Sequence, residues 1–97
     1  MKGHSKSVCC MLLDPTNMRL FSGGLDGAVL VWDARVDPNT KFGVERTPIL
    51  ALRGHKKDKR ITGLCYDSQN NILWSACEDG NIRTWDLNVI ISLSYLI

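Results

Sequence analysis

Residues 22–33, SGGLDGAVLVWD, decide the predicted fold. They contain two short runs of strand-forming residues separated by Asp26-Gly27, and they end in Trp32-Asp33. Asp-Gly between two such runs is a strong β-hairpin signal, because the turn needs residues that tolerate positive φ. The same pattern returns at residues 75–86, SACEDGNIRTWD, with the serine, the Asp-Gly and the Trp-Asp at identical spacing. We therefore interpret the two stretches as a repeat.

Each unit is predicted to contain four strands, two in the hairpin and two flanking it, from short apolar or β-branched runs. In the first unit they span 7–13, 19–23, 28–32 and 48–53. In the second unit they span 60–66, 72–76, 81–85 and 89–97. A Gly-His pair opens each unit, at 3–4 and at 54–55, an offset of 51 residues. The offset is 53 between Trp32 and Trp85, because the second unit has a longer polar linker after its Gly-His.

Two segments stand apart from the repeat. The loop 34–47 contains proline, glycine and mixed charge, and it is longer than most connections in compact domains. We expect it to be functional or an adaptable insertion. The final segment 89–97 is uncharged and rich in β formers, so it is expected to be a strand. Its nine residues are fewer than the roughly twenty that a membrane helix needs, so no membrane contact is expected.

Composition limits the class of protein. The 97 residues suffice for one small domain, and 44% hydrophobic with 23% charged residues is globular composition. The net charge of +2 is too small to indicate a nucleic-acid or membrane partner by itself.

The cysteines favour a reducing compartment. Cys9, Cys10, Cys65 and Cys77 show no CxxC spacing, and the chain starts without the apolar core of a secretory signal. We interpret them as reduced thiols of an intracellular protein, cytoplasmic or nuclear. A zinc site built from His4, His55 and these cysteines is the alternative, but the paired ligand spacing of structural zinc sites is missing.

Gly-His, a hairpin with Asp-Gly and a closing Trp-Asp, repeated at about fifty residues, resemble the WD40 repeat of β-propellers. The resemblance covers nearly the whole chain. It implies an all-β fold of two four-stranded antiparallel blades, residues 1–53 and 54–97, which form an incomplete β-propeller.

The resemblance also implies one hydrogen-bonded tetrad per blade. The members by position are Trp32, Ser22, His4 and Asp26 in the first blade, and Trp85, Ser75, His55 and Asp79 in the second. The set is chemically sensible, because an indole only donates, while a hydroxyl and a neutral imidazole each donate and accept. Such buried polar groups are favourable only when every member is satisfied.

Serine, histidine and aspartate together also suggest a hydrolase. A nucleophile needs exposure, a pocket and an oxyanion site, whereas these serines are expected inside a sheet against an indole. We therefore expect no catalytic residue, no metal and no cofactor, and we assign the tetrads a structural role.

Two blades do not close a ring, since propellers use roughly four to eight. One face of each blade is then expected to expose apolar side chains and to favour self-association. We interpret the chain as a fragment of a larger propeller. The alternatives are several copies that close one ring and a folded two-blade sandwich.

The expected function is a non-catalytic scaffold for protein–protein contacts, by analogy with this family. Two alternatives are the propeller part of a multidomain enzyme, such as a kinase or phosphatase, and a substrate receptor of a cullin-4 ubiquitin ligase. The second rests on Arg35 in a WDxR submotif, which the second unit lacks because Asn88 stands there. Nucleic-acid binding ranks third, because aromatic residues are not interleaved with the basic ones.

The loops that follow Gly-His are expected to share one side of the sheet with the Asp-Gly turns. They carry five basic residues, Lys6, Lys56, Lys57, Lys59 and Arg60. These residues are candidates for contact with an acidic or phosphorylated segment. The simpler interpretation is a solvated basic loop. The run KKDKR is also weakly similar to a nuclear import signal.

Overall fold

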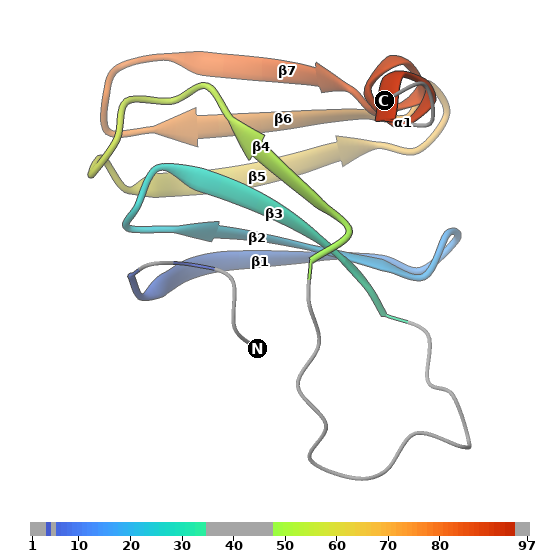
Figure 1. The fold of residues 1–97 in the computed structure, drawn as a ribbon, viewed down its shortest axis with the longest axis horizontal. Helices are drawn as coiled ribbons and strands as arrows, with labels where there is room; N and C mark the ends of the chain where they lie inside the picture. Colours follow the sequence, from blue (N-terminus) through green and yellow to red (C-terminus); the bar gives the residue numbers. More distant parts are fainter. Residues whose placement is uncertain (1–3, 5, 35–47, 95–97) are drawn as a thin grey trace, which may run out of the picture.

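The structure, a computed structural model, describes residues 4, 6–34 and 48–94. In this part of the chain it contains seven strands and one helix (Figure 1). The strands are β1 (Val8–Asp14), β2 (Arg19–Gly24), β3 (Ala28–Asp33), β4 (Leu50–Arg53), β5 (Ile61–Asp67), β6 (Ile72–Cys77) and β7 (Ile82–Asp86). The helix is α1 (Leu87–Ser94).

The strands form two antiparallel sheets, which lie one above the other in Figure 1. The first sheet has the order β1-β2-β3-β4 and the second has the order β5-β6-β7. The predicted strands from the first unit through residue 85 are confirmed to within two residues at each end. The predicted all-β fold of two antiparallel sheets is confirmed as well, and the first sheet has its four predicted strands.

Both hairpins turn at the predicted Asp-Gly. Gly27 and Gly80 have φ values of 77° and 87°, in the left-handed region that glycine adopts without steric cost. A Cβ built on Gly27 would also lie 2.5 Å from the carbonyl oxygen of Lys56. Glycine is therefore required there both by the turn and by the neighbouring loop.

The two sheets repeat each other in register. Leu20 pairs with Trp32 across β2 and β3, and Leu73 pairs with Trp85 across β6 and β7. The first hairpin of each sheet carries its register shift at the same place, between Val8 and Cys10 and between Ile61 and Gly63. Matched register means that equivalent residues of the two repeats lie on equivalent faces, because side chains alternate along a strand.

The main hydrophobic core lies between the two sheets. Its buried members are Phe21, Val29, Val31, Leu52, Ile61, Leu73, Cys77 and Leu87. A smaller cluster of Ala28, Leu30 and Trp32 lies on the opposite face of the first sheet. Strand β3 is therefore buried on both faces, which its continuous apolar sequence reflects.

A buried polar network also joins the two sheets. The Arg19 guanidinium contacts the Asp14 carboxylate at 3.0 Å within the first sheet. The same Nη2 atom donates to the Tyr66 hydroxyl and to the Asn71 amide oxygen of the second repeat, each at 2.7 Å. Arg19 is not among the residues predicted from sequence, although a buried arginine in a strand is rarely found without a partner.

The last segment corrects a prediction. A strand was expected at 89–97, but residues 87–94 form α1, so the second sheet has three strands in the described part of the chain. The Asp86 carboxylate accepts from the backbone N–H groups of Asn88 and Val89, at 3.1 and 3.3 Å, as an N-cap does. Leu87 is buried and Ile90 packs against the core. Capping and apolar burial thus favour a helix over a strand in this uncharged segment.

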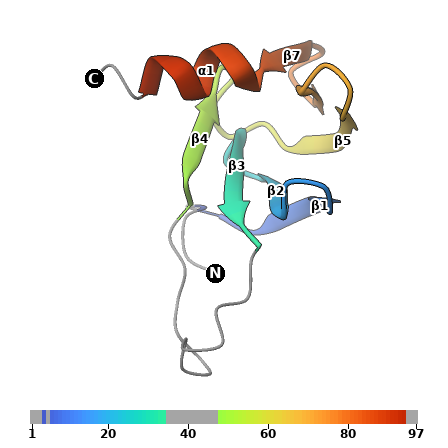
Figure 2. The ribbon, with the colours of Figure 1, turned by 90° about the vertical axis from the view of Figure 1, so that its right-hand side faces the viewer.

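Figure 2 shows α1 leaving the end of β7 and running across the end of the molecule. In the described residues, no helix has the length and apolar character that spanning a bilayer requires. The loop predicted at 34–47 lies almost wholly outside the described residues, apart from Ala34.

The Arg19 network predicts a large loss of stability on truncation. Arg19→Ala leaves the buried Asp14 carboxylate without its cation, so we expect the free energy of unfolding to fall by about 3–5 kcal/mol. Arg60→Ala is the matched control, because the Arg60–Glu78 pair is half-exposed and is expected to contribute less than about 1 kcal/mol. Equal losses in denaturant unfolding of the two variants would contradict a special role for Arg19.

Acid sensitivity is the second prediction of this network. Burial acts to raise the pKa of Asp14, but hydrogen bonds from Asn17 and Arg19 outweigh burial and hold this pKa below its usual value. The charged carboxylate therefore stabilises the fold above the unfolded-state pKa of about 3.9, and this contribution is lost as the pH falls toward the lower folded value. Unfolding curves measured below pH 5 should show a weaker acid dependence in Asp14→Asn than in the parent protein.

Candidate functional site

Four polar side chains of the first repeat lie within hydrogen-bond distance of one another. The Trp32 indole N–H donates to Ser22 Oγ at 2.7 Å. His4 Nε2 is 2.7 Å from the same oxygen, and His4 Nδ1 is 3.2 Å from Asp26 Oδ1. The group connects β3, β2, the segment before β1 and the hairpin turn.

The second repeat brings together the equivalent four residues. The Trp85 indole N–H donates to Ser75 Oγ at 2.8 Å, and His55 Nε2 is 2.7 Å from that oxygen. His55 Nδ1 is 3.3 Å from Asp79 Oδ2. The eight residues expected from sequence thus form two separate relays of the same geometry.

The chemistry of the donors assigns the direction of each relay. Because the aspartate carboxylate only accepts, the neutral histidine carries its proton on Nδ1 and donates it to the aspartate. Its Nε2 therefore accepts from the serine hydroxyl, whose oxygen accepts from the indole N–H. In the described part of the chain, no buried side-chain nitrogen or oxygen is left without a hydrogen-bond partner. Full satisfaction is the condition under which such a network stabilises a fold.

The aspartates also organise the turns. Asp26 Oδ1 accepts from the Ala28 N–H at 3.2 Å, and Asp79 Oδ1 accepts from the Asn81 N–H at 2.9 Å. Asp79 Oδ2 accepts from the Lys56 N–H at 2.9 Å. Hydrogen bonds from the Lys56 and Asn81 backbones, together with His55, hold the pKa of Asp79 far below its usual value. This carboxylate therefore remains an acceptor and fixes the loop that follows β4.

Neither serine has the surroundings of a nucleophile. Ser22 and Ser75 are each 1% exposed, and each Oγ is already engaged by an indole and an imidazole. A nucleophile must reach a substrate carbonyl beside an oxyanion site. What this arrangement can do chemically is hold strands, turn and loop together.

One group of possible metal ligands occurs among the described residues. Ligand atoms of His55, Cys77 and Asp79 all lie within 4.8 Å of one another. Each already has a protein partner: His55 and Asp79 bond to each other, and the Cys77 thiol donates to the Lys59 carbonyl oxygen at 3.5 Å. Burial raises the pKa of the Cys77 thiol, which favours the protonated form over the thiolate that metals bind. His4, the other histidine of the predicted zinc alternative, belongs to the separate first relay.

The predicted basic residues divide into two kinds. Lys6 pairs with Asp58 at 2.8 Å, and Arg60 pairs with Glu78 at 2.9 Å. In contrast, Lys56, Lys57 and Lys59 are exposed, and among the described residues none of them has an ion-pair partner. We call Lys56, Lys57 and Lys59 the lysine cluster.

The remaining candidate, Arg35, lies outside the described residues, so the WDxR interpretation stays a prediction. Asn88, its counterpart in the second repeat, accepts a hydrogen bond from Asn71 at 2.8 Å.

Loss of either relay serine should destabilise the protein. Ser22→Ala and Ser75→Ala each leave an indole N–H and an imidazole nitrogen unpaired, so we expect the free energy of unfolding to fall by about 1–3 kcal/mol. Ser68→Ala, at an exposed turn position, is the control and should change it by less than about 0.5 kcal/mol. An esterase activity that disappears with either relay serine while the protein stays folded would refute the structural assignment.

Comparison with known proteins agrees with this geometry. The family profile described as "WD domain, G-beta repeat" (WD40) matches residues 1–33 and 46–86. WD repeat and FYVE domain-containing protein 1 of Mus musculus is 35% identical over 92% of this chain. Protein lethal(2)denticleless of Drosophila melanogaster is 28% identical over 88% of the chain, and striatin of Homo sapiens is 29% identical over 88%.

The matches cover 19%, 14% and 11% of these relatives, so the chain spans less than a fifth of each. The family profile, by contrast, matches well over half of the chain, and the matched residues include all eight members of the two relays. The chain therefore belongs to the WD40, G-beta repeat family.

Proposed function

We propose that the chain is a non-catalytic scaffold that binds other proteins, and that the lysine cluster contacts an acidic or phosphorylated segment. Family membership supports the general role, since WD repeats serve mainly as interaction platforms. The observation that carries the specific proposal is the exposure of three neighbouring cations without an ion-pair partner among the described residues. The relays support the non-catalytic role, because their polar groups are already hydrogen-bonded to one another.

The lysine cluster sits on a loop of defined shape. The Lys59 N–H donates to the Lys56 carbonyl at 3.2 Å, and Asp58 between them has a φ of 65°. The Lys56 N–H is bound by Asp79, which anchors the start of the loop to the second relay. A loop fixed in this way presents its charges with less ordering cost on binding than a free segment would.

A hollow next to the cluster offers room for a ligand group. It has a volume of about 190 Å³, and its lining includes Arg53 and Lys57 together with the Asp26 carboxylate and His55. Arginine and lysine both form charge-assisted hydrogen bonds with carboxylate or phosphate oxygens. Asp26 is already engaged by His4 and by the Ala28 N–H, so the charges that favour an anionic peptide over a neutral one are those of Arg53 and the lysine cluster.

The free cysteines are the basis on which we propose an intracellular location. All four cysteines are free thiols, and Cys9 and Cys65 are exposed. Exposed thiols persist in reducing surroundings, which supports an intracellular location, cytoplasmic or nuclear. The multidomain-enzyme and ligase-receptor alternatives remain predictions, the latter testable by pull-down of the ligase adaptor with Arg35→Ala as control.

Charge reversal tests the lysine cluster. Binding of a fluorescent acidic phosphopeptide is measured by anisotropy for the parent protein and for the triple variant Lys56→Glu, Lys57→Glu, Lys59→Glu. We expect the triple variant to bind at least about tenfold more weakly, since one lost charge-assisted contact already corresponds to about that factor. Parent binding should also weaken as salt increases, because exposed charges are screened.

Arg83→Glu is the control for a charge reversal elsewhere on the surface, since Arg83 is exposed on β7 and belongs to neither the cluster nor the hollow. It should leave peptide binding nearly unchanged. Unaltered binding in the triple variant would reduce the cluster to a solvated loop. Salt-dependent retention on an oligonucleotide resin, lost in the same variant, would instead favour the nucleic-acid alternative.

A further inference from the structure

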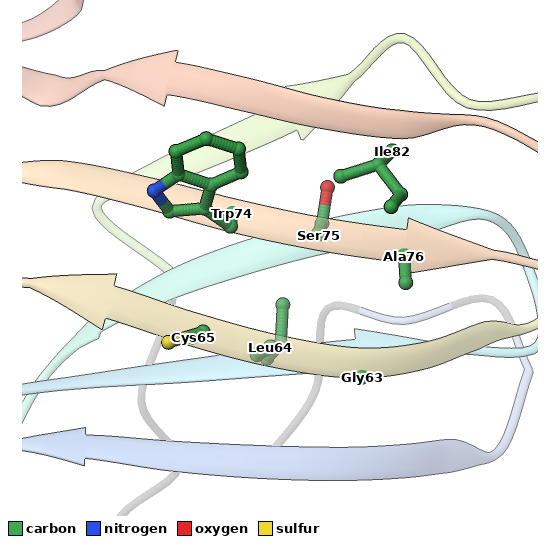
Figure 3. A pocket seen from close by; sticks show the side chains of 7 residues that line it. All are labelled: Gly63, Leu64, Cys65, Trp74, Ser75, Ala76 and Ile82. Carbon is green, nitrogen blue, oxygen red and sulfur yellow. The ribbon is translucent and has the colours of Figure 1, made fainter.

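The outer face of the second sheet carries an open apolar hollow of about 460 Å³. Figure 3 shows the Trp74 and Ile82 side chains bordering it, with Ala76 farther along β6 and Gly63 on β5. Trp74 is 47% exposed and Ile82 is 71% exposed. Large apolar side chains gathered on one open face commonly mark an interaction surface.

The equivalent face of the first sheet is covered. By repeat register, Phe21 corresponds to Trp74 and Gly23 to Ala76. Phe21 is fully buried, and its ring lies 5.2 Å from that of Tyr66 in β5. A Cβ built on Gly23 would lie 2.5 Å from the Ile61 side chain, so Ile61 fits directly over this glycine. Strand β5 is therefore the element that covers the first sheet.

The residues by which β5 makes this contact have exposed counterparts in β1. Ile61, Leu64 and Tyr66 pack against the core between the sheets. Their counterparts by register are Val8, Met11 and Leu13, which are 47%, 58% and 54% exposed. One molecule thus exposes both halves of a contact that it already makes internally: the covering strand on one side and the face to be covered on the other.

The polar part of the internal contact changes on both halves together. Internally, Arg19 donates to Tyr66 and Asn71. On the open face the counterpart of Arg19 is Ile72, and the counterpart of Asp14 is Asp67. Asp67 is bound instead within its own turn, by the Asn70 side chain at 2.8 Å. On the exposed strand side, the counterparts of Tyr66 and Asn71 are Leu13 and Met18, the latter 40% exposed. Asn71 and Met18 even share a positive φ, at 55° and 50°.

The replacement is complementary, because an arginine with two polar acceptors becomes an isoleucine with two apolar partners. An uncompensated change on one half alone would bury an unpaired polar group.

We propose that a second copy of this chain docks the outer face of its β1 onto the outer face of the second sheet. In this contact Val8, Met11 and Leu13 of one copy cover Trp74 and Ile82 of the other, as β5 covers the first sheet. The open space at Gly63, where an added Cβ would meet nothing within 4 Å, leaves room for this strand. Because the two halves are different surfaces, the contact is heterologous and joins copies head to tail.

Two complementary variants test the proposal by sedimentation velocity over a concentration series. Leu13→Lys places a charge on the covering strand, and Trp74→Lys places one on the covered face. The parent chain should form species larger than one chain that grow with concentration. Each variant alone should associate at least about tenfold more weakly, since a buried unpaired charge outweighs the apolar contact.

The decisive arm mixes the two variants. Each retains one intact half, so an equimolar mixture should form a discrete species of two chains and nothing larger. Val89→Lys, at a 53% exposed apolar position on α1 outside both halves, is the control and should associate like the parent chain. Circular dichroism checks the fold, and Val8→Lys with Ile82→Lys provides a second pair if either first variant unfolds.

Several outcomes would overturn the proposal. A parent chain that stays monomeric at every concentration, or a Leu13→Lys variant that still forms dimers through Trp74, excludes head-to-tail docking. Loss of association in Val89→Lys would indicate non-specific aggregation. None of these results bears on peptide binding by the lysine cluster, so the two proposals can fail independently.

Discussion

A serine hydroxyl held between an indole N–H and an imidazole nitrogen is the interaction on which both sheets depend. Ser22 and Ser75 are buried, so their polar atoms must be satisfied within the protein. Each serine brings the third strand to the second and, through histidine and aspartate, ties the preceding loop to the hairpin turn. The relay requires one strand register, because a slip by one residue would move the serine to the other face of the sheet.

That register is what makes the two repeats comparable residue by residue. With identical relays, the two sheets differ in what their remaining positions carry. The first sheet has Arg19 and Phe21 where the second has Ile72 and Trp74. The former pair is buried against β5, whereas Trp74 remains exposed. The chain therefore contains one complete contact between its two sheets. It also exposes, on β1 and on the outer face of the second sheet, the two surfaces that an equivalent contact would use.

The residues of the two relays hold the fold together and are distinct from the residues proposed for partner binding. Both histidines, which most resemble catalytic residues, are hydrogen-bonded to a serine and an aspartate of their own relay. The charges that we propose for recognition are those of the lysine cluster, on the loop between β4 and β5, whose start is anchored by Asp79. A rigid scaffold that presents charged loops is a common way for proteins to recognise partners. The scaffold proposal follows from this division of roles.

Sequence alone determined the repeat, the turns and nearly all the strands, because these depend on local patterns: the positive φ that glycine adopts after aspartate in both turns, and short apolar or β-branched runs. The relay residues followed from the resemblance of the two units to the WD40 repeat. Sequence alone failed at residues 87–94, where the cap from Asp86 and burial of Leu87 produce a helix. A short uncharged run of β formers does not reveal whether a core lies beside it.

Only the tertiary structure decided which side chains distant in sequence contact each other. It paired Lys6 with Asp58 and Arg60 with Glu78, left the lysine cluster without ion pairs among the described residues, and joined Arg19 to the second repeat. Such contacts join residues far apart along the chain or in different loops, so their partners follow from packing and not from local sequence.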